Sequence, residues 1–176
     1  MAPAAVDESV RPGETPAEHV RRLAEAKAAA AAARYPDALV LGADTVVVRD
    51  GAILGKPRDA AEARSMLRSL AGRSHEVYTG VAIVGEGRLV SEVDRAEVRF
   101  APMTDAEIDW YIATGEPYDK AGAYAVQGRA SRYVEAVTGA PSTVIGLPVA
   151  TVCRLLRQFE QGSQLLAASG SVVPVP

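Results

Sequence analysis

An aspartate inside an otherwise apolar segment is the first residue of this chain that indicates chemistry. Asp44 lies in a run of aliphatic, glycine and threonine residues that extends from Ala38 to Val48. Desolvating a lone ionised carboxylate is very costly, so Asp44 must be paired, bound to a metal, or placed at a cleft. The alternative is a strand-end aspartate that caps a turn. Apolar residues continue past Asp44, however, and the turn signal comes only at Asp50–Gly51.

Three lysines could supply the positive charge that such a carboxylate needs. Lys27 follows Val20 and Leu23 at helical spacing, so it projects from the apolar stripe of an expected helix. Lys56 lies just beyond a short expected strand, and Lys120 lies in a later loop. The alternatives are a snorkelling stem at the edge of the core for Lys27 and solvated loop lysines for the other two.

Gln127 and Glu8 complete the set of candidate residues. Gln127 lies among small residues that would let a planar ligand approach the backbone, and its amide can pair with a base or ribose edge. Alternatively, Gln127 is a polar surface residue and Glu8 is part of a solvated acidic chain start. Taken together, carboxylates, lysines and a glutamine indicate phosphate chemistry. Carboxylates can hold a divalent cation and activate water, while lysines neutralise polyphosphate oxygens.

Other catalytic arrangements find little support in the sequence. It contains neither a G-x-x-x-x-G-K-[ST] loop nor a G-x-G-x-x-G segment that opens a helix. No Ser-His-Asp or Cys-His arrangement stands out, and His75 is expected to pack or cap near the end of a helix. The single cysteine, Cys153, excludes an intrachain disulfide and a cysteine-based zinc cluster.

Composition and charge exclude several classes of protein. The 176 residues include 19 Lys and Arg against 22 Asp and Glu, and 48% are hydrophobic, as expected for one globular domain. A net charge of −3 argues against a nucleic-acid polymer as partner. No apolar run approaches the ~20 residues that cross a bilayer, and the first residues lack the features of a signal peptide. We therefore expect a cytoplasmic protein with no membrane partner.

Helices and strands alternate along the expected domain, which spans residues 6–160. Capping boxes predict helices that start at Thr15, Asp59 and Thr104, and a last helix passes through Phe159. Strands are expected at 38–48, 52–54, 77–84, 89–100 and 133–137, the first being a central strand covered on both faces. This order predicts the α/β class with a mixed sheet. From Gln161 to Pro176 we expect a disordered tail.

Nine short motifs occur in one order along the chain. They are 6–8, 13–16, 26–28, 42–47, 55–57, 75–81, 119–124, 126–128 and 144–148. This ordered set resembles the Maf family of nucleotide pyrophosphatases over about residues 6 to 159. The Gly-Ala-Asp-Thr and Val-Gln-Gly forms are more similar to the branch that acts on dTTP and UTP than to the branch that acts on 7-methyl-GTP.

The resemblance implies a cytoplasmic enzyme that converts nucleoside triphosphates to monophosphate and pyrophosphate and removes non-standard nucleotides. It implies a fold similar to inosine triphosphatases, with a mixed, elongated sheet flanked by helices and a substrate cleft between two lobes. A homodimer is a further hypothesis by analogy. The implied roles are a proton acceptor at Asp44, a divalent metal (Mg or Mn) on Glu8 and Asp44, and substrate contacts at Lys27, Lys56, Thr45, Gln127 and Lys120.

The chain departs from the family pattern before the acidic pair Asp7–Glu8. The usual first strand, Ser-x-Ser-Pro-Arg-Arg loop and helix are absent from residues 1–6. Either the reading frame starts upstream or the chain is a weakened relative without this loop. The alternative functions are a catalytically silent nucleotide-binding or interaction protein, and an enzyme of the same type that prefers purine or methylated nucleotides.

Overall fold

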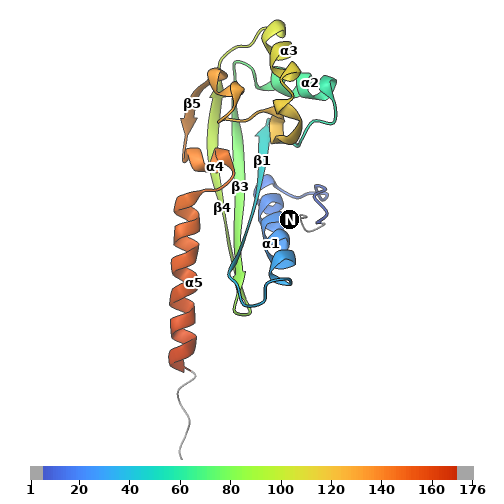
Figure 1. Cartoon of the computed structure of the whole chain (residues 1–176). Helices are drawn as coiled ribbons and strands as arrows, with labels where there is room; N and C mark the ends of the chain where they lie inside the picture. Colours follow the sequence, from blue (N-terminus) through green and yellow to red (C-terminus); the bar gives the residue numbers. More distant parts are fainter. Residues whose placement is uncertain (1–5, 170–176) are drawn as a thin grey trace, which may run out of the picture.

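The computed structural model describes residues 6–169, and the side chains of residues 6–162. Within this range, five strands form one sheet in the order β2-β1-β3-β4-β5. Two long strands, β3 (Ser74–Gly85) and β4 (Arg88–Phe100), run along most of the molecule (Figure 1). The elongated α/β sheet that we expected is confirmed. Every strand pairing in it is antiparallel, so the sheet is not mixed in direction.

The remaining strands and the helices are arranged around this central hairpin. The other strands are β1 (Val40–Arg49), β2 (Ala52–Leu54) and β5 (Val134–Thr138). The α-helices are α1 (Pro16–Ala32), α2 (Ala60–Leu70), α3 (Asp105–Ala113), α4 (Pro141–Ile145) and α5 (Val149–Ser169). Three short 3-10 helices, η1 (Glu116–Asp119), η2 (Ala121–Ala123) and η3 (Arg129–Tyr133), connect α3 to β5. The capping boxes predicted at Thr15 and Thr104 are both present.

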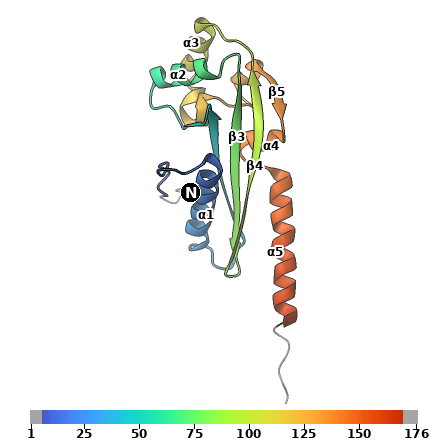
Figure 2. The ribbon, with the colours of Figure 1, turned by 180° about the vertical axis from the view of Figure 1, so that it is seen from behind.

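Helices cover both faces of β3 at the level of residues 80–83. Helix α1 packs on the face that carries Gly80 and Ala82, whereas α5 packs on the opposite face against Val81 and Ile83. In Figures 1 and 2, α1 and α5 lie on opposite sides of the β3–β4 hairpin, and α2 and α3 gather at its other end. The hairpin therefore joins two lobes, in line with the expectation from the sequence.

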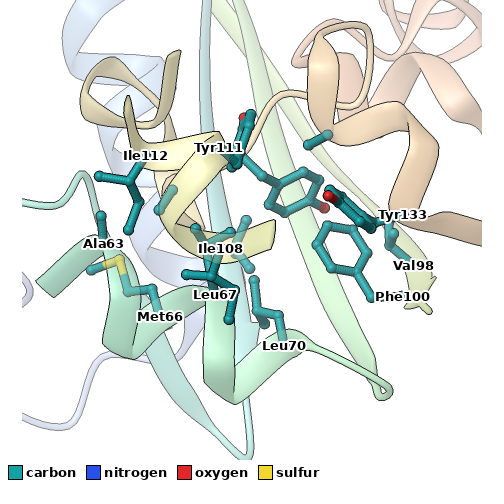
Figure 3. Packing of buried hydrophobic residues seen from close by; sticks show 14 of the residues in the cluster. Ala63, Met66, Leu67, Leu70, Val98, Phe100, Ile108, Tyr111, Ile112 and Tyr133 are labelled. Atoms are coloured by element: carbon teal, nitrogen blue, oxygen red, sulfur yellow. The ribbon is translucent and has the colours of Figure 1, made fainter. Parts of the chain in front are cut away.

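The largest core cluster lies where α2 and α3 meet the sheet. Leu67 and Leu70 of α2 and Ile108 of α3 are fully buried there with Phe100 of β4 (Figure 3). Burying side chains of this size contributes about 1.5–3 kcal/mol each relative to exposure. This cluster packs the α2–α3 lobe onto the sheet.

Two glycines let α1 lie directly on the sheet. A Cβ atom at Gly42 would lie 2.5 Å from the carbonyl oxygen of Ala24, and one at Gly80 would lie 2.3 Å from that of Val20. Such contacts are shorter than any carbon–oxygen packing distance, so a side chain at either position would displace the helix. The close approach brings Lys27 of α1 level with the middle of β1.

The prediction that β1 is covered on both faces is wrong. Its residues alternate between faces, and α1 covers the face of Gly42, Val46 and Val48. On the other face Thr45 borders a cavity, and Leu41 is exposed near the start of the strand. The apolar residues of β1 contact α1 and the core cluster at α2 and α3. They do not lie between two complete covering layers.

The C-terminal helix is longer than expected. Helix α5 continues to Ser169, so the disorder predicted from Gln161 is wrong for residues 161–169. Leucine, alanine and glutamine in this segment favour the helix and outweigh Gly162. Residues 170–176, the rest of the predicted tail, lie outside the described residues.

Candidate functional site

A partly buried ion pair links α1 to β1 at the centre of the candidate site. The ammonium Nζ of Lys27 lies 2.6 Å from Oδ1 of Asp44 and 2.7 Å from Oε1 of Glu8. The side chain of Asp44 is 11% exposed, whereas that of Glu8 is 53% exposed. The inward projection of Lys27 and the pairing of Asp44 are therefore as the sequence predicts.

Burial and charge act in opposite directions on these groups. Burial raises the pKa of Asp44 above its ordinary value, and the hydrogen bond from Lys27 only partly offsets this. Burial also acts against the ammonium of Lys27, but hydrogen bonds to Asp44 and Glu8 raise its pKa overall. The hydrogen bond from Lys27 lowers the pKa of Glu8. Lys27 is thus a fixed cation beside a carboxylate with increased proton affinity.

The segment before α1 holds Glu8 in position. The guanidinium of Arg22 donates to the backbone oxygens of Asp7 and Ser9 and to both carboxylate oxygens of Glu14. The neighbouring Arg22 holds the pKa of Glu14 far below its ordinary value. Because Arg22 lies on the same helix as Lys27, this anchor places Glu8 over the ammonium.

A cavity of about 580 Å³ opens on the face of β1 opposite α1. Its walls come from β1, the loop after β2, the segment from η1 to residue 128, and the end of α4. The volume falls within the range of small-molecule sites. The sequence-predicted residues among those that line it are Asp44, Thr45, Lys56, Lys120 and Gln127.

The predicted residues fall into two groups that meet at Asp44. Glu8 and Lys27 contact Asp44 from the α1 side but do not line the cavity, whereas the other candidates line it. Consecutive strand residues point to opposite faces, which explains why Asp44 meets Lys27 while Thr45 faces the cavity. Strand β2 pairs with β1 only at Val47–Arg49, so the edge of β1 at Asp44 is not covered by β2. Asp44 can therefore also reach the cavity.

Backbone contacts bring distant segments to the cavity wall. The amide of Gly122 donates to the carbonyl of Gly55 at 3.0 Å, which places Lys56 beside the η2 segment. Lys56 has no ion-pair partner among residues 6–162, while Lys120 pairs with Asp119 at 2.6 Å. Lys56 is therefore the more available cation for a ligand in the cavity.

The sequence analysis missed Glu116, which organises the segment that carries Gln127. Its carboxylate accepts hydrogen bonds from the hydroxyl of Tyr111 at 2.7 Å and from the amide of Arg129 at 3.0 Å. The same tyrosine oxygen accepts from the amide of Ala125 at 3.3 Å. Both ends of the segment 125–129 are thus attached to α3 and η1, and Gln127 lies between them. No local sequence pattern reveals this contact.

Thr79 is a second residue that the sequence analysis did not single out. It is fully buried on β3, directly opposite Thr45 in the β1–β3 register. Its Oγ1 lies 2.9 Å from Oγ1 of Thr45 and donates to the carbonyl of Thr143 at 2.7 Å. A polar residue between Val77 and Val81 on the same strand face was the available signal.

His75 is a packing residue, as expected. It is 2% exposed, packs edge-on against the rings of Phe100 and Tyr124, and its Nε2 lies 2.9 Å from the hydroxyl of Tyr124. Burial lowers the pKa of His75 to about 4, so the ring is neutral near pH 7.

The described residues contain no cluster of three or more His, Cys, Asp or Glu side chains that could hold a metal ion. Glu8 and Asp44 nevertheless meet at one point, on Lys27. Two carboxylates combined with substrate phosphates form a common ligand set for Mg²⁺. The donor chemistry at this point therefore fits a cation that the substrate helps to hold.

No helix within residues 6–169 is both long and apolar enough to cross a bilayer.

Comparisons with known proteins match most of this chain. Residues 1–159 match the family described as Maf-like protein. A dTTP/UTP pyrophosphatase of Symbiobacterium thermophilum is 52% identical over 155 residues, covering 88% of this chain and 79% of the relative. A protein of the same name from Bacillus cytotoxicus is 48% identical over 158 residues, covering 90% of this chain and 83% of the relative. Because the family match spans residues 1–159 and these relatives are about half identical over most of the chain, the chain belongs to the Maf family.

Proposed function

We propose that this chain is an acid-anhydride hydrolase that converts UTP and dTTP to the nucleoside monophosphate and pyrophosphate. The observation that carries the proposal is a mostly buried carboxylate, Asp44, paired with Lys27 at the edge of a cavity that Lys56 and Gln127 also line. Relatives that are about half identical over most of the chain carry the name dTTP/UTP pyrophosphatase. A raised pKa at a cavity is a recurrent feature of catalytic groups.

Asp44 accepts the proton of the attacking water. Its Oδ1 is fixed by Lys27, and its Oδ2 has no hydrogen bond to any residue of the described chain, so Oδ2 is the atom that can bind water. Burial increases the proton affinity of this carboxylate, which improves it as a general base.

The lysines bind the triphosphate. An ammonium group has three donors, and Lys27 uses two of them on Asp44 and Glu8, so the third is available for a phosphate oxygen. Lys56 contributes a second positive charge from the cavity wall, and Lys120 contributes a third. Fixed cations of this kind stabilise the charge that develops as the leaving pyrophosphate departs.

Glu8 and Asp44 would hold a divalent cation, Mg²⁺ or Mn²⁺, together with phosphate oxygens. When bound, such a cation would screen the negative charge of the triphosphate. The anchor formed by Arg22 supports this role, because it keeps Glu8 beside the carboxylate of β1.

The nucleoside lies in the cavity against Thr45 and Gln127. Asp44 and Thr45 are consecutive residues that both line this cavity, and in the proposed pose the phosphorus next to the nucleoside lies beside the water bound at Asp44. Attack at this α-phosphorus forms a new oxygen–phosphorus bond in the monophosphate and breaks the bond to the β-phosphate oxygen. The leaving group is pyrophosphate.

We place this reaction in the cytoplasm, where it would remove non-standard or surplus nucleotides from the triphosphate pool. The exposed, unpaired thiol of Cys153 is compatible with a reducing compartment. A homodimer, and the lack of nucleic-acid and membrane partners, remain predictions.

The test is product analysis with purified protein, Mg²⁺ or Mn²⁺, and UTP or dTTP. We expect pyrophosphate as the first product, and we expect Asp44→Asn to lower turnover by at least about 10²-fold, because an amide cannot accept the proton. Lys120→Met serves as a comparison, since it removes a charge but no base. Orthophosphate as the first product would reject the proposal. Nucleotide binding without turnover would instead support a silent binding protein.

A further inference from the structure

A row of hydrogen bonds through three threonines connects the cavity to the buried side of β3. Thr45 lines the cavity, Thr79 is fully buried behind it, and Thr143 lies beyond Thr79 at the α4 segment, also fully buried. The three residues are linked by an oxygen–oxygen distance of 2.9 Å between the two hydroxyls and one of 2.7 Å from Thr79 to the Thr143 carbonyl.

The carbonyl of Thr143 fixes which hydroxyl donates and which accepts in this row of hydrogen bonds. A carbonyl oxygen has no proton, so two oxygens 2.7 Å apart require Thr79 to donate its only hydroxyl proton to Thr143. Thr79 then has lone pairs but no proton for Thr45. The 2.9 Å contact between the hydroxyls therefore requires Thr45 to donate to Thr79.

Thr45 consequently presents only lone pairs to the cavity. A free hydroxyl can turn to donate or accept, but here the proton is held on the buried side. Gln127, the other predicted substrate contact on this wall, carries both a donor and an acceptor. It therefore does not by itself select between donor and acceptor groups of a ligand. The group of a ligand that meets Thr45 must therefore be a hydrogen-bond donor.

We infer that Thr79 is a positioning residue that makes Thr45 an acceptor for the N3–H group of uracil and thymine, and that this polarity discriminates against cytosine. The inference rests on the proposed function, in which the nucleoside lies against Thr45. N3–H is shared by uracil and thymine. Cytosine carries a lone pair at N3, which would meet the lone pair of Thr45. An unsatisfied pair of buried acceptors costs about 1–3 kcal/mol, which corresponds to roughly 5- to 150-fold in specificity.

The test compares kcat/KM for UTP and CTP in three proteins: wild type, Thr79→Val and Thr79→Ser. We expect wild type to prefer UTP by at least about tenfold and to lose a similar factor on N3-methyl-UTP. Thr79→Val removes the acceptor behind Thr45, so the Thr45 proton becomes free to bind N3 of cytosine. The kcat/KM for CTP should then rise while that for UTP falls. Thr79→Ser keeps the hydroxyl and should keep the wild-type preference.

This pattern separates positioning from a purely structural role. Damage to the fold would lower both activities together, whereas the inference requires the value for CTP to rise. A wild-type UTP/CTP ratio near one, or an equal loss for both substrates in Thr79→Val, would overturn it.

A binding measurement keeps the inference testable even if the proposed reaction fails. Calorimetric titration of wild type and both variants with UMP and CMP reads the same discrimination without turnover. We expect tighter binding of UMP by wild type and Thr79→Ser, and a loss of this difference in Thr79→Val. Equal affinities in wild type would refute the role of Thr79. Absence of pyrophosphate release in the same samples would refute the proposed function alone.

Discussion

At the scale of single residues, the pair of Asp44 and Lys27 combines two requirements that conflict. A general base needs a raised pKa, which burial provides, but a buried carboxylate must also remain ionised near neutral pH. Lys27 meets the second requirement with a hydrogen bond of 2.6 Å, while Oδ2 is left for water. Lys27 therefore lowers the pKa of Asp44 in addition to its proposed contact with substrate.

This balance predicts how activity depends on pH. Since Asp44 must be ionised, kcat/KM should fall on the acid side through a pKa above the 3.8 of an unperturbed aspartate. Lys27→Met removes the hydrogen bond that lowers this pKa, so the acid limb should move to higher pH and activity at pH 7 should drop by about tenfold or more. Lys27→Arg keeps the charge and is the control. Steady-state rates between pH 4 and 9 would show the shift, and an acid limb unmoved in Lys27→Met would contradict this role.

At the scale of secondary-structure elements, the position of Lys27 depends on how closely α1 approaches β1. A Cβ at Gly42 would lie 2.5 Å from the carbonyl oxygen of Ala24 and 2.7 Å from the amide nitrogen of Ala28, the residue after Lys27. Both contacts are to backbone, so no side-chain movement relieves them. The glycine thus connects sheet packing directly to the geometry of the ion pair.

Gly42→Ala should therefore reduce both stability and activity. We expect a loss of about 1–3 kcal/mol in the free energy of unfolding, as for overpacked cores, and a fall in kcat because Lys27 moves away from Asp44. Gly55→Ala is the matched control for stability, since a Cβ there meets no atom within 4 Å. Chemical denaturation gives the comparison, and equal stability of the two variants would show that α1 tolerates the displacement.

The sequence predicts elements better than it predicts their contacts. Capping boxes at Thr15 and Thr104 fix helix starts because their hydrogen bonds are local. The Asp44–Lys27 pair was accessible because each residue alone violates an apolar pattern. The alignment of Thr45 with Thr79 was not accessible, because it depends on the register between strands 34 residues apart in sequence. The contact between Glu116 and the amide of Arg129 was not accessible either, because it joins two segments that no local pattern relates.

At the scale of the whole molecule, the cavity lies between the two lobes of the sheet. On one face of β3, Val77 belongs to the α2–α3 core, Val81 belongs to the α5 core, and Thr79 lies between them. The two cores therefore hold the sheet on either side of the site and leave a polar position at its floor. A substrate bound there contacts β1, the 116–128 segment and α4 at the same time.

The central claim is that water held at Asp44 attacks the phosphorus next to the nucleoside. The most direct measurement is single-turnover hydrolysis of UTP in ¹⁸O-labelled water, with mass analysis of both products. The account predicts the label in UMP and unlabelled pyrophosphate, with no comparable turnover in Asp44→Asn. Label in pyrophosphate, or formation of orthophosphate and UDP as the products, would place the attack at another phosphorus and contradict the account.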